Sequence, residues 1–170
     1  MITKSEEETR ELARGLAKEL KGGDVIALEG DLGAGKTTFV QGLALGLGVG
    51  VLPKSPTFVL MREYEGRLKL YHIDCYRLED PKALLGLGLE DLFKDKNSVV
   101  AIEWADKVKE LLPKNTIWVK IDSEGNNRNI NIRGGDTVGS GAMLKMADNA
   151  KATKGPRDLS ERVDEFLYRK

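Results

Sequence analysis

The chain has 170 residues, 41% of them hydrophobic, and its 27 basic side chains balance 27 acidic ones. This length is typical of one domain with a real core, and the zero net charge disfavours a protein that binds nucleic acid through its overall field. The sequence has no apolar run of about eighteen residues and no secretion signal, so we expect a cytoplasmic protein without membrane contact.

Residues 5–21 are predicted to form the first helix. Ser5 and Glu8 have the spacing of a capping box, and apolar residues recur along one helical face. A Gly-Gly pair directly after this segment is expected to end the helix. The apolar run at 25–28 then predicts a buried strand that leads into a glycine-rich loop.

The loop at 30–37 reads Gly-Asp-Leu-Gly-Ala-Gly-Lys-Thr and matches the phosphate-binding pattern G-x-x-x-x-G-K-[ST] at every fixed position. A buried strand precedes it and a helical apolar repeat follows it, which is the order that such a loop requires. Because the start of a helix offers unpaired N–H groups and partial positive charge, we expect phosphate to lie over residues 33–38. The sequence therefore predicts a nucleotide binder rather than an incidental glycine turn.

The groups of this loop have distinct expected roles. Gly33 and Gly35 let the backbone curl around phosphate oxygens. Lys36 is expected to reach the β and γ phosphates, and the Thr37 hydroxyl to take one position on Mg²⁺, which prefers oxygen ligands. The nucleotide-binding residues predicted in the loop are Asp31, Gly33, Ala34, Gly35, Lys36, Thr37 and Thr38.

Two β-rich segments, 58–64 and 67–73, follow a glycine-containing loop. They flank Glu65 and Gly66, which predicts an antiparallel hairpin with a tight turn.

Asp74 is a candidate for an acidic group beside a bound nucleotide. Alternation along a strand would place His72, Asp74 and Tyr76 on one face, although a hydrogen-bonded edge strand accounts for this row equally well.

His72 is the only histidine, and we interpret it as a packed strand residue rather than a metal ligand. The single cysteine, Cys75, excludes an intrachain disulfide and is interpreted as a small buried hydrophobe.

The second half of the chain continues the alternation of helices and strands. Asp80 and Pro81 predict the N-cap and first position of a short or interrupted helix. The apolar run 98–102 predicts a parallel strand covered on both faces. A helix through Leu112 and strands at 117–121 and 129–132 complete the order.

This order predicts an α/β protein with a three-layer, P-loop NTPase-like fold, in which helices flank a mixed parallel and antiparallel sheet. Residues 1–133 are expected to form the P-loop ATPase domain. Residues 134–170 are expected to form a C-terminal extension with a glycine-rich joint and an amphipathic helix from Asp158, which would dock on the core or on a partner.

A bound Mg·ATP also needs an acidic group near the metal and a group that places the attacking water. Glu103 follows the apolar run 98–102 directly. Because sheets of this kind open their ligand crevice at the carboxyl ends of the strands, we expect the Glu103 carboxylate to approach Mg²⁺ directly or through water.

Four blocks of the sequence together resemble the bacterial TsaE family, formerly called YjeE. They are Gly30–Thr38, Ser55-Pro56-Thr57-Phe58, His72-x-Asp74-x-Tyr76-Arg77 and Ile102-Glu103-Trp104, and the resemblance covers residues 3–133. It implies a small P-loop ATPase needed to make N6-threonylcarbamoyladenosine (t6A37) in tRNA.

The resemblance also implies the roles of particular residues. Asp74 would be the acid on which hydrolysis depends, and Glu103 the Walker B acid that joins Thr37 at the metal. Thr57 would be a switch-like threonine near the γ phosphate, so that Asp74, Glu103 and Thr57 form the catalytic set. Trp104 would lie near the nucleotide, although a packed aromatic is an equal alternative.

Arg128 is a further nucleotide contact that the resemblance implies. As partners, it implies a complex of TsaB and TsaD, in which TsaD transfers the threonylcarbamoyl group, and it implies contact with tRNA only through that complex. ATP hydrolysis would drive or reset this assembly, with an ATPase that is weak alone and stimulated by its partners.

Three other interpretations remain open at this point. A P-loop small-molecule kinase fits the loop equally well, although no lid-like arginine cluster is evident. A GTPase is disfavoured because the chain has no Asn-Lys-x-Asp segment. A nucleotide sensor with little turnover is disfavoured because both Asp74 and Glu103 are present.

Overall fold

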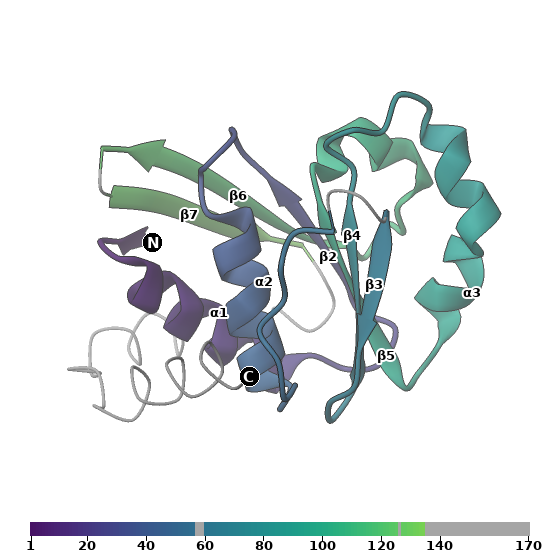
Figure 1. Cartoon of the computed structure of the whole chain (residues 1–170), viewed down its shortest axis with the longest axis horizontal. Helices are drawn as coiled ribbons and strands as arrows, with labels where there is room; N and C mark the ends of the chain where they lie inside the picture. Colours follow the sequence, from purple (N-terminus) through teal and green to yellow (C-terminus); the bar gives the residue numbers. More distant parts are fainter. Residues whose placement is uncertain (57–59, 126, 135–170) are drawn as a thin grey trace.

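The computed structural model describes residues 1–56, 60–125 and 127–134. A seven-stranded sheet runs in the order β1-β7-β6-β2-β5-β4-β3, with helices on both of its faces (Figure 1). The elements are β1 Ile2–Thr3, α1 Glu6–Glu19, β2 Val25–Glu29, α2 Lys36–Gly46, β3 Met61–Tyr64, β4 Lys69–Asp74, the 3₁₀ helix η1 Pro81–Leu87, α3 Leu89–Lys94, β5 Ser98–Glu103, the 3₁₀ helix η2 Ala105–Leu111, β6 Ile117–Glu124 and β7 Asn127–Arg133. The predicted three-layer α/β fold is confirmed.

The sheet mixes parallel and antiparallel pairs. The central strand β2 pairs in parallel with β5 and β6, and β4 pairs in parallel with β5. The outer pairs β3–β4, β6–β7 and β1–β7 are antiparallel. The central strands are therefore covered on both sides, as their near-continuous apolar sequences predict.

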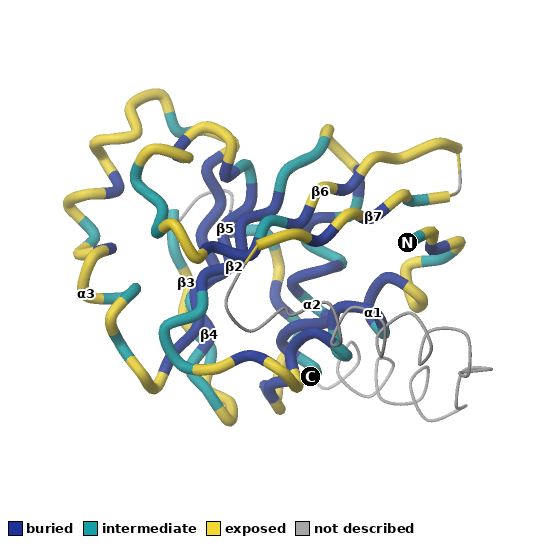
Figure 2. The backbone as a smooth tube through the Cα atoms, turned by 180° about the vertical axis from the view of Figure 1, so that it is seen from behind, coloured by how far each residue is buried: buried dark blue, intermediate teal, exposed yellow. Residues whose placement is uncertain are grey.

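Successive residues of β2 enter different cores. Ile26 and Leu28 pack in a cluster with α1 and α2, whereas Val25 and Ala27 pack in a second cluster with η1, α3 and η2. Figure 2 shows the resulting continuous buried region along β2 and β5. This double burial fixes the end of β2, and so the start of the phosphate-binding loop, in a rigid part of the molecule.

Helices α1 and α2 approach each other closely through two glycines of α2. A Cβ atom on Gly42 would lie 2.3 Å from the carbonyl oxygen of Arg10, and one on Gly46 would lie 2.5 Å from Cβ of Ala17. No side chain fits at either position without a shift of α1. The two glycines therefore set the distance between the helices that cover this face of the sheet.

We expect Gly42→Ala to lower the free energy of unfolding by about 1–3 kcal/mol, because overpacking against α1 outweighs the better helix propensity of alanine. Gly15→Ala is the matched control, since a Cβ on Gly15 of α1 meets no atom within 4 Å. That substitution should stabilise the chain by about 0.5–1 kcal/mol. Urea denaturation measures both, and destabilisation of equal size in the two variants would contradict the packing argument.

Several boundaries differ from those predicted. Helix α1 ends at Glu19, before the Gly-Gly pair, although Ser5 does cap it by accepting a bond from the Glu8 amide at 3.1 Å. The capping box is not reciprocal, because Glu8 Oε2 accepts from the Lys4 amide instead. Strand β1 was not predicted, since two residues are too few to show alternation.

The hairpin of β3 and β4 is antiparallel as predicted, but its turn is not tight. The connection comprises residues 65–68, because it is held by the end of α2: the Arg67 amide donates to the Leu47 carbonyl at 2.6 Å. The interrupted helix is confirmed as η1 and α3, with Gly88 between them at φ 70° and Asp80 capping η1.

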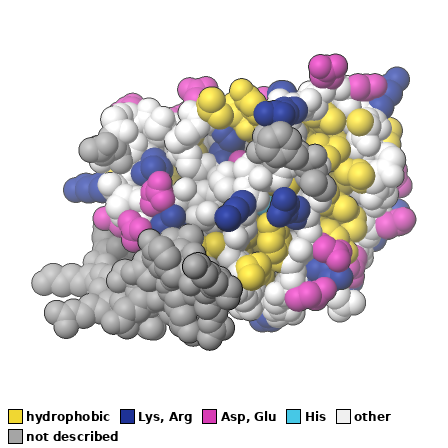
Figure 3. Space-filling view, in the orientation of Figure 1, with side chains coloured by type: hydrophobic (Ala, Val, Ile, Leu, Met, Phe, Trp, Pro, Cys, Tyr) yellow, Lys and Arg dark blue, Asp and Glu magenta, His cyan; other side chains and the backbone are white. Residues whose placement is uncertain are grey.

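The extension predicted at 134–170 lies outside the described residues beyond Gly134. Among the described residues, no helix has the length and apolar character needed to cross a membrane. On the face shown in Figure 3, basic and acidic side chains are interspersed, in keeping with the balanced composition.

Candidate functional site

The phosphate-binding loop joins the end of β2 to the start of α2, as predicted. Gly30, Gly33 and Gly35 have φ values of 146°, 78° and 107°, a region of backbone conformation that favours glycine. Gly35 is the N-cap of α2, so the first amides of this helix face the loop without a side-chain cap. This is the arrangement that a phosphate anion requires.

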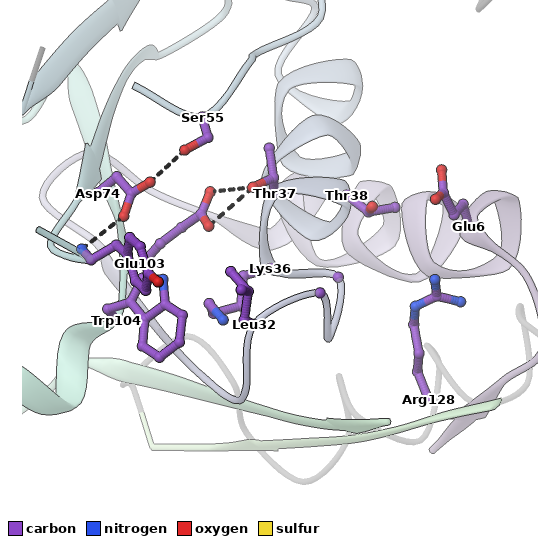
Figure 4. Close-up of a pocket in the computed structure, with 13 residues that line it drawn as sticks. Glu6, Leu32, Lys36, Thr37, Thr38, Ser55, Asp74, Glu103, Trp104 and Arg128 are labelled. Carbon is purple, nitrogen blue, oxygen red and sulfur yellow. Dashed lines mark hydrogen bonds between the residues drawn. The ribbon is translucent and has the colours of Figure 1, made fainter. Parts of the chain in front are cut away.

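A pocket of about 450 Å³ opens beside this loop (Figure 4). In addition to the loop and the first residues of α2, the pocket is lined by residues of α1, of the segment before β3, of the carboxyl ends of β4 and β5, and of β7. Its lining residues are Glu6, Leu32, Gly33, Gly35, Lys36, Thr37, Thr38, Ser55, Asp74, Tyr76, Glu103, Trp104 and Arg128. Most residues that the sequence predicts for the site are thus brought together.

Two predicted residues that the structure describes, Ala34 and Asp31, are not in this lining. Ala34 is buried in the core cluster beneath α1 and α2, so its side chain does not reach the pocket. Asp31 lines a neighbouring pocket on the other side of Trp104, together with Lys120 and other charged residues. Thr57 lies outside the described residues.

Lys36, the first residue of α2, is held at the base of the loop. Its Nζ donates to the carbonyl oxygens of Gly30 at 2.6 Å and Asp31 at 2.7 Å, and lies 3.8 Å from the ring centroid of Trp104. Burial lowers the pKa of Lys36 below its ordinary value, while the Glu103 carboxylate acts in the opposite direction. The Lys36 ammonium thus lies beside the loop amides. A phosphate bound there would bring negative charge next to this cation.

Glu103 ends β5 and is only 3% exposed. The hydroxyl of Thr37, the second residue of α2, donates to its two carboxylate oxygens at 2.9 and 3.0 Å (Figure 4). Hydroxyl and carboxylate oxygens are hard donors that suit Mg²⁺, which normally keeps several further ligands as water or phosphate. Within the described ranges no group of three or more His, Cys, Asp or Glu side chains is placed to hold a metal ion.

Asp74 ends β4 and lies opposite Glu103 in the parallel register of β4 and β5. Its carboxylate accepts hydrogen bonds from the Ser55 hydroxyl and from the Tyr76 amide, the latter at 2.9 Å. The buried Asp74 and Glu103 therefore line one pocket from adjacent strands, as two acids beside a phosphate loop should.

His72, Asp74 and Tyr76 were predicted to share one face of a strand, and this prediction is wrong for Tyr76. Strand β4 ends at Asp74, so Tyr76 lies past it, and the Tyr76 ring packs against Trp104 with centroids 5.0 Å apart. His72 is a packed strand residue, as interpreted from the sequence, and is fully buried. Its imidazole does not line the pocket but lies behind it, with Nε2 2.8 Å from Oε1 of Glu103.

Arg128 and Glu6 lie at the opposite end of the pocket, beyond Thr38 (Figure 4). The Arg128 side chain passes so close to Gly35 that a Cβ atom there would be 2.9 Å from its Nε. Sequence reasoning missed Glu6, because no motif connects the first residue of α1 with the loop. It also assigned no role to Ser55, although Ser55 is the first residue of the block Ser55-Pro56-Thr57-Phe58, one of the four blocks on which the family resemblance rests.

Cys75 lies between Asp74 and Tyr76 but points into the core. Burial raises the pKa of its thiol to about 12. We therefore expect the folded protein at neutral pH to react with a thiol reagent at least about a hundredfold more slowly than the urea-unfolded chain, because thiolate is scarce and inaccessible. Fast labelling of the folded chain would contradict this burial.

Comparisons with known proteins show which proteins this chain is similar to. The family model described as "Threonylcarbamoyl adenosine biosynthesis protein TsaE" matches residues 3–130. The TsaE protein of Bacillus subtilis is 45% identical over 124 residues, which cover 72% of this chain and 77% of that protein. The TsaE protein of Streptomyces coelicolor is 38% identical over 146 residues, which cover 82% of this chain and 95% of that protein.

A solved structure is also similar. The crystal structure of Bacillus subtilis YdiB superimposes with a TM-score of 0.67 and 35% sequence identity, over 89% of this chain and 93% of that one. The curated relatives carry the name "tRNA threonylcarbamoyladenosine biosynthesis protein TsaE".

Proposed function

The chain belongs to the TsaE family of threonylcarbamoyl adenosine biosynthesis proteins, and from this premise we propose that it binds and hydrolyses Mg·ATP as the ATPase of t6A formation in tRNA. The observation that carries the proposal is the convergence of Lys36, Thr37, Asp74 and Glu103 on one pocket at the start of α2. A cation, a hydroxyl and two carboxylates around a loop of helix-terminal amides are the groups that phosphoryl transfer to water needs.

Each of these groups has a place in the proposed reaction. The amides of residues 33–38 and the Lys36 ammonium would hold the β and γ phosphates, and Lys36 would exchange its carbonyl partners for phosphate oxygens. Thr37 and Glu103 would hold Mg²⁺, which neutralises charge that develops on the phosphates.

Asp74 would accept a proton from the attacking water, since its carboxylate lines the pocket and is oriented by Ser55 and by the Tyr76 amide. Thr57 is proposed as the switch-like residue near the γ phosphate. At the far end, Arg128 and Thr38 would contact the nucleotide beyond its terminal phosphates.

The proposed partners are TsaD and TsaB, with hydrolysis resetting their complex between rounds. The balanced charge of the chain supports contact with tRNA only through that complex. Because the modification acts on tRNA, the proposal places the chain in the cytoplasm.

Phosphate release from ATP tests this proposal. It is measured for the full-length chain alone and for the chain with a TsaB–TsaD complex, and each preparation is assayed both in Mg²⁺ and in a chelator. We expect slow Mg²⁺-dependent hydrolysis alone and faster hydrolysis with the complex. Transfer of phosphate to a small-molecule acceptor in place of water would instead establish the kinase alternative. Displacement of ATP by GTP at equal concentration, together with phosphate release from GTP, would instead favour a GTPase.

A further inference from the structure

The buried side of Glu103 carries a feature that nucleotide binding leaves unexplained. The chain's only histidine, His72, lies on the neighbouring strand β4 and is fully buried. Its Nε2 is 2.8 Å from Oε1 of Glu103, the same oxygen that accepts from the Thr37 hydroxyl at 2.9 Å. One carboxylate oxygen is thus bound from the strand side and from the helix side at once.

The other imidazole nitrogen identifies the tautomer. Nδ1 of His72 is buried and has no hydrogen-bond partner among the described residues. If Nδ1 carried the proton, Nε2 would present a lone pair to the Glu103 carboxylate, and a buried N–H would have no acceptor. If Nε2 carries it, the imidazole donates to the carboxylate and only a lone pair is left without a partner. The tautomer with the proton on Nε2 therefore satisfies the His72 imidazole and the Glu103 carboxylate better.

We infer that His72 is a positioning residue for the metal: its Nε2–H donates to Oε1 of Glu103 and holds that carboxylate in the orientation in which Glu103 and Thr37 bind Mg²⁺. This inference deepens the proposed function and rests on it. Hydrogen-bond partners behind a metal-binding side chain fix its orientation, and their loss typically costs about 10–100-fold in metal affinity.

Two isosteric substitutions separate this role from a packing role. In His72→Gln the side-chain amide nitrogen takes the place of Nε2 and can still donate to Glu103, whereas in His72→Asn it takes the place of Nδ1 and cannot. Both variants introduce an amide of similar size and polarity into the same buried position. Leu70→Val, on the same strand and fully buried, is the control for mild loss of stability without contact to Glu103.

The readout is calorimetric binding of a non-hydrolysable ATP analogue at a series of Mg²⁺ concentrations, with thermal unfolding measured on the same samples. We expect His72→Asn to raise the Mg²⁺ concentration for half-maximal binding by about tenfold or more. Analogue affinity in a chelator should stay within about twofold of wild type, and His72→Gln should recover most of the Mg²⁺ response.

Equal Mg²⁺ requirements in His72→Asn and the wild type would overturn the inference, as would equal defects in the Gln and Asn variants. Failure of the wild-type chain to bind the analogue at any Mg²⁺ concentration would instead overturn the proposed function, so the two failures are distinguishable.

Because His72 is the only histidine, ¹⁵N spectra of the imidazole give one pair of side-chain nitrogen signals. A proton on Nε2 supports the inference, and a bare Nε2 contradicts it.

Discussion

Replacing Lys36 by alanine is expected to weaken ATP binding by about 10–100-fold and to abolish measurable hydrolysis, because the variant loses a charge-assisted hydrogen bond to the phosphates of about 1.5–3 kcal/mol. The loss falls on both binding and turnover, since the ammonium would also stabilise charge that develops on the γ phosphate in the transition state. Affinity is measured by calorimetry and turnover by phosphate release, each in Mg²⁺.

The matched control for this substitution is Lys94→Ala. Lys94 is an exposed lysine of α3 whose only ion pair, among the described residues, is with Glu90 of the same helix. Its loss should leave binding and hydrolysis unchanged. If Lys36→Ala retained wild-type affinity while unfolding at the same temperature as the wild type, the loop would not be where ATP binds.

Replacing Asp74 by asparagine is expected to lower hydrolysis by about 10²–10⁴-fold and to leave nucleotide affinity nearly unchanged, because only the group that accepts the proton of the attacking water is removed. Asparagine keeps the size of the side chain and an oxygen that can accept from the Tyr76 amide, so the end of β4 should stay in place. Single-turnover phosphate release, with and without TsaB–TsaD, measures the effect.

Asp122→Asn is the control for this second substitution. Asp122 is half-exposed on β6, lies outside the proposed ATP pocket, and forms an ion pair with Lys120 at 3.3 Å. Undiminished hydrolysis by Asp74→Asn would exclude Asp74 from catalysis. A variant that lost hydrolysis but still bound ATP normally and supported full t6A formation would instead favour a nucleotide sensor, in which the ATP state alone controls assembly with the partners.

The phosphate-binding loop could be predicted because all its determinants are contiguous. Gly33, Gly35, Lys36 and Thr37 lie within one short segment, and the apolar patterns on either side identify the strand and helix that the loop joins. Glu103 was equally accessible to prediction. It follows directly on an apolar run, and a strand that ends at an acid delivers that acid to the edge of a parallel sheet.

Tyr76 was misplaced because the alternation rule assumes that the strand continues. The Asp74 carboxylate accepts from the Tyr76 amide two residues later, a local turn that ends β4. The Tyr76 ring therefore packs against Trp104 and does not lie on the same strand face as His72. Likewise, the hairpin turn includes Arg67, whose amide donates to the carbonyl of Leu47 at the end of α2, a partner that is distant in sequence.

By itself, the sequence determined the α/β class, the glycine-rich loop between β2 and α2, and the acid at the end of β5, because each depends on neighbouring residues whose chemistry and spacing are local. Only the tertiary structure decided that Glu6 and Ser55 reach the same pocket and that His72 lies behind Glu103. Those contacts depend on the parallel register of β4 and β5 and on the packing of α1 against α2. Register and packing arise from the summed burial of many side chains, and no short segment of the chain encodes them.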